Sequence, residues 1–304
     1  MKRALTKLTL YLTLNAAIYA AAAAYVEHGY TPAEPGASKQ VLYFVPRDTR
    51  TDLVFLGSSR GRAFSQYGNH GRVEKILDKK IVNLSEDGAG IVPARILLSY
   101  FYARGNQADK VLIFLDFFNL LGPETNEDHN FLEDEPLRLG ILPHALRAGL
   151  RPRRLLGYFL KRFAPPYRRR PYLSGRDDEK MTAISIAEIE TRLGSLTFPG
   201  PIPHFERYVR ELEETAALAQ RHGSEVHIVL LPAAYNSHIE LAPGGLDRWL
   251  GFLELFRMRH NVPYHDFRTA MPDLESYSNP EHLNTAGVEL FSARYLKPCL
   301  MESR

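Results

Sequence analysis

The chain has 304 residues, of which 45% are hydrophobic and 24% are charged, and its formal net charge is +3. This composition is typical of a globular protein, and so small a net charge gives no reason to expect a nucleic-acid partner. The only cysteine, Cys299, excludes a disulfide within the chain and any zinc site built from cysteines.

The first thirty residues differ from the rest of the chain. Three basic residues among the first seven precede a run of nineteen residues without a charge, residues 8–26. At a rise of about 1.5 Å per residue this run just spans a bilayer core of ~30 Å. The basic residues before it predict that the rest of the chain faces away from the cytoplasm. We expect a single-pass anchor in the cytoplasmic membrane or a cleaved signal peptide, since the alanines at 20–24 suit cleavage.

Five apolar runs of strand length follow along the chain, at residues 52–57, 80–85, 110–116, 226–232 and 262–267. Helical patterns lie between them, and Tyr208, Leu212, Ala216 and Ala219 mark one face of a helix before the fourth run. Continuous apolar strands that alternate with helices predict an α/β fold with a central parallel sheet covered on both faces. In such a sheet, the ligand site lies at the carboxyl ends of the strands.

Residues from about 120 to 200 interrupt this alternation. An acidic stretch, residues 124–135, precedes residues 136–176, which lack acidic side chains and mix arginine and lysine with leucine, tyrosine and phenylalanine. We expect a basic helical insertion, either solvated or in contact with anionic lipid or polysaccharide. The predicted organisation is an anchor or signal peptide over residues 1–29, a linker over 30–50, and one domain over 51–304 that carries this insertion.

Two polar segments stand where the predicted fold places ligand sites. Gly57, Ser58, Ser59 and Arg60 end the first strand, and His282 lies just before a helix expected to begin near residue 285. A lone serine or a lone histidine is more often structural than catalytic. These two can meet over the same edge of a doubly wound sheet, and the pair therefore deserves more weight than either residue.

Three segments resemble motifs of the SGNH/GDSL hydrolase superfamily, in the same order. FLGSSR (55–60) is similar to the first block, Gly-Asp-Ser, with Ser58 at the aspartate position. VNLSEDGAG (82–90) is similar to the second block, with Asn83 followed five residues later by Gly88, and NPEHLNTAG (279–287) is similar to the last, Asp-x-x-His. IFLDFFN (113–119) stands where Gly-x-Asn-Asp belongs and matches it poorly. The layout is similar to that of membrane-anchored relatives that serve teichoic-acid D-alanylation or alginate O-acetylation.

The resemblance implies a three-layer, flavodoxin-like fold with a serine nucleophile. In it, Ser59 is the nucleophile, His282 is its base, and the backbone N–H groups of Ser59 and Gly88 form the oxyanion hole. Asn119 would add a side-chain donor. Where the family has the acid of its triad, this chain has Asn279.

The replacement at position 279 leaves the third member of the triad open. An amide can orient an imidazole but cannot stabilise its charged form, and an acid-to-amide change in such a triad can cost on the order of 10⁴ in rate. Asp266, at the end of the last predicted strand, or a backbone carbonyl can take the place of the acid. Glu281 is expected to point away from the ring.

Three further residues are candidates for substrate contact. Arg60 either grips an anionic or sugar substrate or pairs with Glu86 or Asp87. Tyr235 and His238, just past the fourth strand, either line the substrate cleft or pack within a loop. We expect neither a metal nor a cofactor, because the histidines lack the spacing of metal ligands and no glycine-rich phosphate loop occurs.

The sequence therefore predicts an extracytoplasmic, membrane-anchored esterase or O-acyltransferase that acts on ester groups of a cell-envelope polysaccharide or glycopolymer. The alternative is a catalytically impaired accessory protein that binds glycan or partner proteins in a polysaccharide modification or export complex. A lipid esterase working at the membrane is a third option. The expected partners are the polymer, the membrane and other envelope acyl-transfer or export proteins.

Overall fold

The computed structural model describes residues 2–28, 35, 40–120, 122–160, 204–234 and 245–301. The expected strands form one sheet in which every neighbouring pair is parallel, in the order β2-β1-β3-β4-β5. This order is that of flavodoxin-type sheets. The strands are β1 (Arg50–Gly57), β2 (Ile81–Asn83), β3 (Gln107–Phe114), β4 (Glu225–Leu230) and β5 (Tyr264–Asp266). The prediction of an α/β fold with a central parallel sheet is confirmed.

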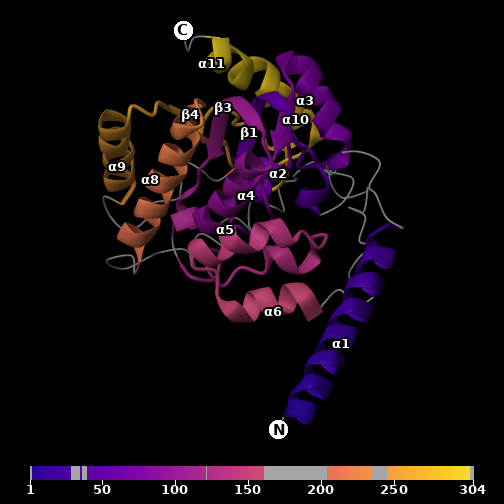
Figure 1. Cartoon of the computed structure of the whole chain (residues 1–304). Coiled ribbons are helices and arrows are strands. Elements are labelled where there is room, and N and C mark those ends of the chain that lie inside the picture. The colour runs from indigo at the N-terminus through magenta and orange to yellow at the C-terminus, as the bar shows by residue number, and fades with distance from the viewer. Residues whose placement is uncertain are drawn as a thin grey trace.

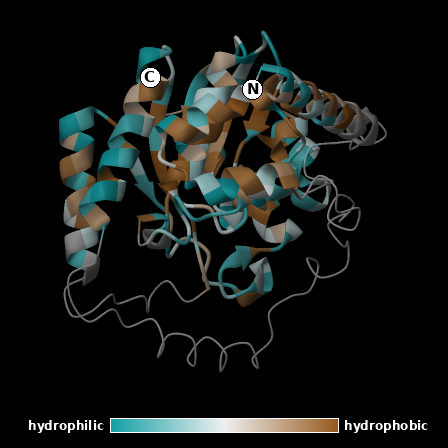
Figure 2. Cartoon of the chain, turned by 60° about the horizontal axis from the view of Figure 1, so that its bottom comes forward, coloured by the Kyte–Doolittle hydropathy of each residue, from teal (hydrophilic) through white to brown (hydrophobic). Residues whose placement is uncertain are grey.

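Each face of the sheet is covered by its own set of helices (Figure 1). Successive residues of a strand point to opposite faces, so Val54 and Leu56 of β1 belong to one core, and Leu53 and Phe55 to the other. Hydrophobic residues are concentrated on the sheet between the helices (Figure 2). The first core is covered by α4 (Ile91–Ala103), α8 (Phe205–Arg221) and α9 (Gly245–His260), and the second by α3 (Asn69–Leu77) and α10 (Thr285–Phe291).

The remaining elements of the domain are short. The two-stranded hairpin of β6 (Tyr277–Asn279) and β7 (His282–Leu283) carries the histidine of the last motif and leads directly into α10. The helix α2 (Ser59–Arg62) carries the serine motif. The others are α5 (Leu142–Arg147) and α6 (Pro152–Leu160), within the predicted insertion, and α11 (Lys297–Met301) near the C-terminus.

The basic insertion begins by pairing with the acidic stretch before it. Arg151 and Arg153 lie 2.9 and 2.5 Å from the carboxylate of Asp128, and Arg154 lies 3.3 Å from Glu133. These arginines are therefore partly neutralised within the domain, and their charge is not all directed at an external surface. The rest of the predicted basic segment, residues 161–176, lies outside the described residues.

The N-terminal helix α1 (Lys2–His28) lies apart from the sheet (Figure 1). The side chains of residues 2–18 are exposed. Across the described ranges, no helix is both long enough and apolar enough to cross a membrane, so the expected transmembrane helix is not found there.

The second half of the expected linker belongs to the domain. Val41, Leu42 and Val45 are buried in the first core. The backbone N–H groups of Val41 and Leu42 donate to the two carboxylate oxygens of Glu135, at 2.6 and 2.8 Å. The packed domain therefore begins near residue 40 and not at residue 51.

Candidate active site

The turn that follows β1 is supported from below by aromatic rings. Phe55, Phe64 and Phe114 pack together with ring centroids 5.0 to 5.9 Å apart. A Cβ atom on Gly57 would lie only 2.9 Å from the carbonyl oxygen of Phe114, so the close approach of β1 to β3 at this point requires glycine. Ser59 comes two residues later, as the first residue of α2, on a rigid base.

Ser59 meets His282 across the edge of the sheet. The Oγ atom of Ser59 lies 2.7 Å from Nε2 of His282, and Nδ1 of the same ring lies 2.9 Å from Oδ1 of Asn279. Residues 223 positions apart in the chain are thus brought within hydrogen-bonding distance. The order nucleophile, base and orienting group is that of a serine hydrolase triad.

The hydrogen bonds around Asn279 fix the tautomer of the histidine. Its Oδ1 accepts the backbone N–H groups of Glu281 and His282, at 2.9 and 3.1 Å. Because a backbone N–H can only donate, the oxygen and not the nitrogen of the amide faces this side. The Nδ1 atom of His282 therefore carries a proton, and in the neutral ring Nε2 can accept the proton of Ser59.

Asp266, the acidic residue considered as a substitute for the missing acid, is bonded to an arginine. Asp266 forms a two-pronged ion pair with Arg268, at 2.8 and 2.7 Å. Although burial by itself raises the pKa of Asp266, the hydrogen bonds from Arg268 bring it below its usual value. The structure thus gives the orienting role to Asn279.

The expected oxyanion glycine lies on the wall of the same pocket as Ser59 and His282. Gly88 has a φ of 67°, a conformation that glycine adopts without strain. Within the described part of the chain, the backbone N–H groups of Ser59 and Gly88 donate to no acceptor. Both donors are therefore available to a ligand.

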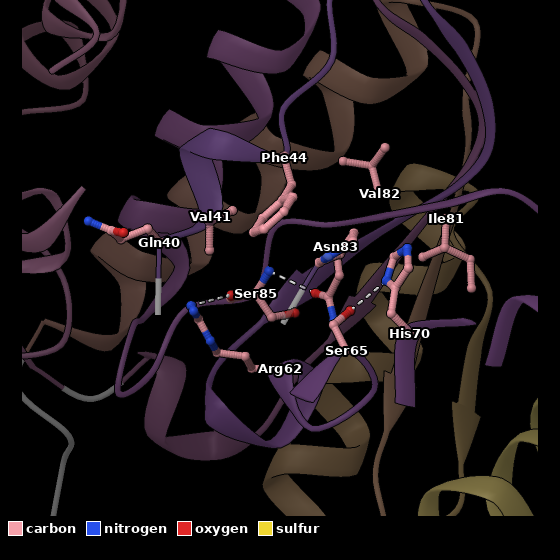
Figure 3. A pocket seen from close by; sticks show the side chains of 11 residues that line it. Gln40, Val41, Phe44, Arg62, Ser65, His70, Ile81, Val82, Asn83 and Ser85 are labelled. Carbon is pink, nitrogen blue, oxygen red and sulfur yellow. Dashed lines mark hydrogen bonds between the residues drawn. The ribbon is translucent and has the colours of Figure 1, made fainter. Parts of the chain in front are cut away.

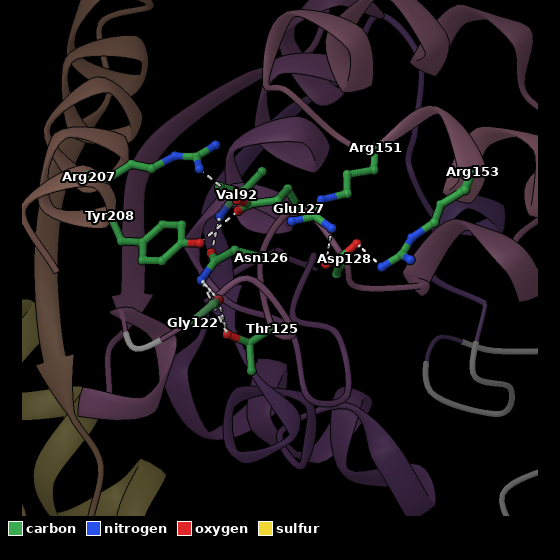
Figure 4. A network of polar contacts seen from close by, with 10 residues as sticks. All are labelled: Val92, Gly122, Thr125, Asn126, Glu127, Asp128, Arg151, Arg153, Arg207 and Tyr208. Atoms are coloured by element: carbon green, nitrogen blue, oxygen red, sulfur yellow. Dashed lines mark hydrogen bonds and ion pairs between the residues drawn. The ribbon is translucent and has the colours of Figure 1, made fainter. Parts of the chain in front are cut away.

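Two buried asparagines hold the loop that carries Gly88. Asn119 donates to the carbonyl oxygen of Ala89 at 2.9 Å, and Asn126 accepts the N–H of Val92 at 3.0 Å. Asn126 also donates to the carbonyl of Gly122 at 2.9 Å (Figure 4). Asn119 does not line the pocket, so the structure gives it a supporting role and not the expected one of a direct oxyanion donor.

The support of this loop continues into α8. Glu127, next to Asn126, accepts hydrogen bonds from Arg207 at 2.7 Å and from the hydroxyl of Tyr208 at 2.8 Å (Figure 4). Burial, together with the hydrogen bond to Glu127, raises the pKa of Tyr208, which keeps its hydroxyl protonated as a donor. No local pattern in the sequence marks Asn126 or Glu127, because Val92 and the residues of α8 that they contact are distant along the chain.

Arg62, and not Arg60, reaches the acidic pair after β2. Arg62 is buried and lies 2.5 Å from the carboxylate of Glu86 and 3.9 Å from that of Asp87. Burial raises the pKa of Glu86, and the charge of Arg62 opposes this shift. Arg62 thereby joins the helix of the nucleophile to the loop of Gly88.

Arg60 points to another strand end. It donates to the carbonyl oxygens of Leu231 and Pro232, at 2.5 and 2.9 Å, and does not line the pocket. Arg62 thus takes the expected pairing with Glu86 and Asp87, and substrate contact by Arg60 stays a prediction. The guanidinium of Arg60 ties α2 to the end of β4.

Ser58 faces away from the substrate side. Its hydroxyl donates to Asp116 at 3.2 Å. Burial raises the pKa of the Asp116 carboxyl, while the charge of Arg60 and the bond from Ser58 act against this shift. Of the two adjacent serines, only Ser59 thus lines the pocket.

The pocket around these groups has a volume of about 320 Å³. Tyr235 and His238, which were expected to line a substrate cleft, lie outside the described residues. No group of three or more histidine, cysteine, aspartate or glutamate side chains in the described ranges is placed to hold a metal ion. The wall is formed by Ser59, Ala63, Gln66, Tyr67, Asn69, Asp87, Gly88, Ser278, Asn279, His282, Leu283 and Thr285.

A further serine–histidine contact, that of Ser65 and His70, lies in a much smaller cavity (Figure 3). Ser65 Oγ is 3.0 Å from Nδ1 of His70. The cavity that both residues line has a volume of about 40 Å³, which is room for a few water molecules at most. An ester substrate does not fit there, whereas the pair of Ser59 and His282 lines the pocket of about 320 Å³.

Comparison with known proteins does not assign a function to the chain. No family model matches the chain, and no curated protein matches it. Among solved structures, the chain is similar to a protein from Bacteroides fragilis that is named as a candidate acylhydrolase. That similarity has a TM-score of 0.44 at 11% identity and covers 86% of this chain and 92% of that one. A likeness this distant establishes neither a family nor an activity.

Proposed function

We propose that the protein is a serine-dependent esterase or O-acyltransferase of the SGNH type. The observation that carries this proposal is the continuous chain of contacts from Ser59 Oγ to His282 Nε2, at 2.7 Å, and from His282 Nδ1 to Asn279, at 2.9 Å. These contacts open onto a pocket that also exposes Gly88. Acyl transfer requires an activated nucleophile, here the hydroxyl of Ser59, and hydrogen-bond donors for the oxyanion, here the two backbone N–H groups.

The proposed reaction has two halves. His282 Nε2 takes the proton of Ser59 as Oγ attacks the carbonyl carbon of the ester, and the N–H groups of Ser59 and Gly88 stabilise the negative oxygen. His282 then gives the proton to the leaving alkoxide, and an acyl-Ser59 remains. A water molecule or an acceptor hydroxyl, deprotonated by His282, attacks this ester and restores Ser59.

The pocket wall favours a small acyl group on a polar alcohol. Apart from the ring of Tyr67, only Ala63 and Leu283 add apolar side chains to the described wall. A long acyl chain gains free energy by burying apolar surface, which this wall offers poorly. We therefore propose short-acyl esters of a hydroxyl-rich polymer, such as a cell-envelope polysaccharide or glycopolymer, in preference to lipid esters.

The alternative is an accessory protein that binds glycan without turning it over. Asn279 favours it, because the amide gives the imidazolium that forms during the reaction no compensating negative charge. Such a protein would use the same pocket and would act beside other envelope acyl-transfer or export proteins.

The proposed site of action is outside the cytoplasm, either on the cytoplasmic membrane or released from it. This part of the proposal rests on the basic and then uncharged sequence of the first thirty residues. Cell fractionation followed by intact-mass measurement of the mature chain tests it. A chain found only in the cytoplasm would contradict it.

Ester hydrolysis by the purified full chain tests the catalytic proposal. We expect turnover of p-nitrophenyl acetate, a much lower rate with p-nitrophenyl palmitate, and loss of turnover in Ser59→Ala and His282→Ala. A folded wild type without turnover, which still binds an acetylated glycan, would favour the accessory protein. A preference for the palmitate ester would favour a lipid esterase.

A further inference from the structure

Tyr67 is a residue of the pocket wall that the ester chemistry leaves unexplained. Its backbone is left-handed, with a φ of 56°, and that of the next residue, Gly68, is left-handed as well, with a φ of 74°. Glycine adopts this conformation freely, whereas a bulky L residue is strained in it. A tyrosine thus occupies a position where glycine would relieve the strain.

The other left-handed residues show how unusual this choice is. In the described ranges, the remaining non-glycine residues with positive φ are Asp48, Asp78, His204 and Asn261. All four are of the types that tolerate the conformation best, and none of them lines the pocket. Backbone strain of this kind is concentrated at binding and active sites, where the side chain repays it.

The polar residues that share the pocket wall with Tyr67 indicate what kind of ligand its ring contacts. Gln66, Ser278 and Thr285 supply hydrogen-bonding groups around the same pocket. An aromatic ring among such groups suits a pyranose, because the C–H face of the sugar packs on the ring while its hydroxyls bond to the polar side chains.

We propose that Tyr67 determines specificity by contacting the sugar ring that carries the ester. The proposal rests on the proposed ester chemistry at Ser59. It assigns the alcohol side of the substrate, and not the acyl group, to the wall formed by Tyr67 and its polar neighbours.

Two acetate esters of different size test the proposal with the full chain. Glucose pentaacetate carries a sugar ring, and vinyl acetate carries the same acyl group without one. We expect Tyr67→Ala to lower kcat/KM for glucose pentaacetate about tenfold more than for vinyl acetate. Asp78→Gly replaces a left-handed residue that does not line the pocket; it is the matched control and should leave the ratio unchanged. Equal losses for both esters, or no loss for the sugar ester, would overturn the proposal.

Tyr67→Gly separates a binding role from a packing role. If the side chain of Tyr67 serves binding and not packing, this variant should melt at or above the wild-type temperature, because glycine relieves the backbone strain. It should still lose the preference for the sugar ester. A large fall in Tm would show that the tyrosine serves the fold and would overturn the proposal.

A binding measurement keeps this test distinct from that of the catalytic proposal. Calorimetry with Ser59→Ala protein and glucose pentaacetate measures the contact without turnover, and adding Tyr67→Ala should weaken binding about tenfold. If the wild type hydrolyses neither ester but this loss of binding is seen, the catalytic proposal fails and the sugar contact stands. Unchanged binding would refute the sugar contact alone.

Discussion

Replacing Asn279 with aspartate should make the protein a faster enzyme. In Asn279→Asp, a carboxylate oxygen takes the place of the amide oxygen that now accepts three N–H groups, including Nδ1 of His282 at 2.9 Å. The geometry needs no change. The new feature is a negative charge beside the ring at the moment when the ring becomes positive.

The magnitude follows from the separation and the exposure of the two groups. Two unit charges about 4 Å apart attract by about 1 kcal/mol in water and about 4 kcal/mol at an effective dielectric constant of 20. At about 1.4 kcal/mol per tenfold change in rate, the gain lies between about fivefold and several hundredfold. Because Asn279 is exposed and His282 half-buried, we expect a value in the lower part of this range, on the order of tenfold.

The assay is steady-state hydrolysis of p-nitrophenyl acetate by wild type and variants. Asn261→Asp adds the same charge at an exposed left-handed residue away from the site and should leave kcat unchanged. Asn279→Ala removes the acceptor for Nδ1 and should lower kcat. If folded Asn279→Asp is no faster than the wild type, then His282 does not develop positive charge in the rate-limiting step, and the reasoning is refuted.

Three other predictions concern the support of the site and the fold. Gly88→Ala should cost about 1 kcal/mol of stability, because the φ of 67° strains an L residue. The same change should lower kcat up to about 10²-fold by displacing the oxyanion donor. An unchanged kcat would contradict the role of this loop. Arg62→Ala should cost about 3–5 kcal/mol in urea denaturation, because it leaves the buried Glu86 without its partner; a loss below about 1 kcal/mol would contradict this account. Burial and the neighbouring His227 lower the pKa of His265 to about 4 from its usual 6.5. The unfolded chain therefore binds a proton at this residue more readily than the folded chain. The stabilising contribution of His265 should thus be complete above pH 6.5 and fall as the pH is lowered towards 4. After a discount for solvent screening, the fall is on the order of 1–2 kcal/mol; His265→Gln should reduce it, and an unchanged pH dependence in this variant would rule out His265 as its source.

The sheet was predictable because its signals are local. A strand buried on both faces must be apolar along its whole length, and the five runs of that kind became the five strands. The meeting of Ser59 and His282 followed from topology, since both segments lie at the carboxyl edge of a parallel sheet. The strand ends differ from the predicted runs, and β2 and β5 are each only three residues long.

Roles that depend on side-chain direction were not predictable. Arg60 and Arg62 are two positions apart on a single helical turn, and nothing in the sequence says which of them faces Glu86. Asn119 belongs to the segment that resembles the third motif only poorly, and its amide donates to the carbonyl oxygen of Ala89. The left-handed backbone of Tyr67 likewise has no local cause that the sequence displays.

Covalent labelling shows whether Ser59 is an activated nucleophile. The full-length protein is treated with a fluorophosphonate, and the adduct is located by intact mass and peptide mapping, with Ser59→Ala and His282→Ala as controls. We expect one adduct on Ser59, none on Ser59→Ala, and labelling of His282→Ala slowed by a factor of about 100 or more, the scale of general-base catalysis. An unlabelled but folded wild type, or an adduct that persists in Ser59→Ala, would contradict this role of Ser59.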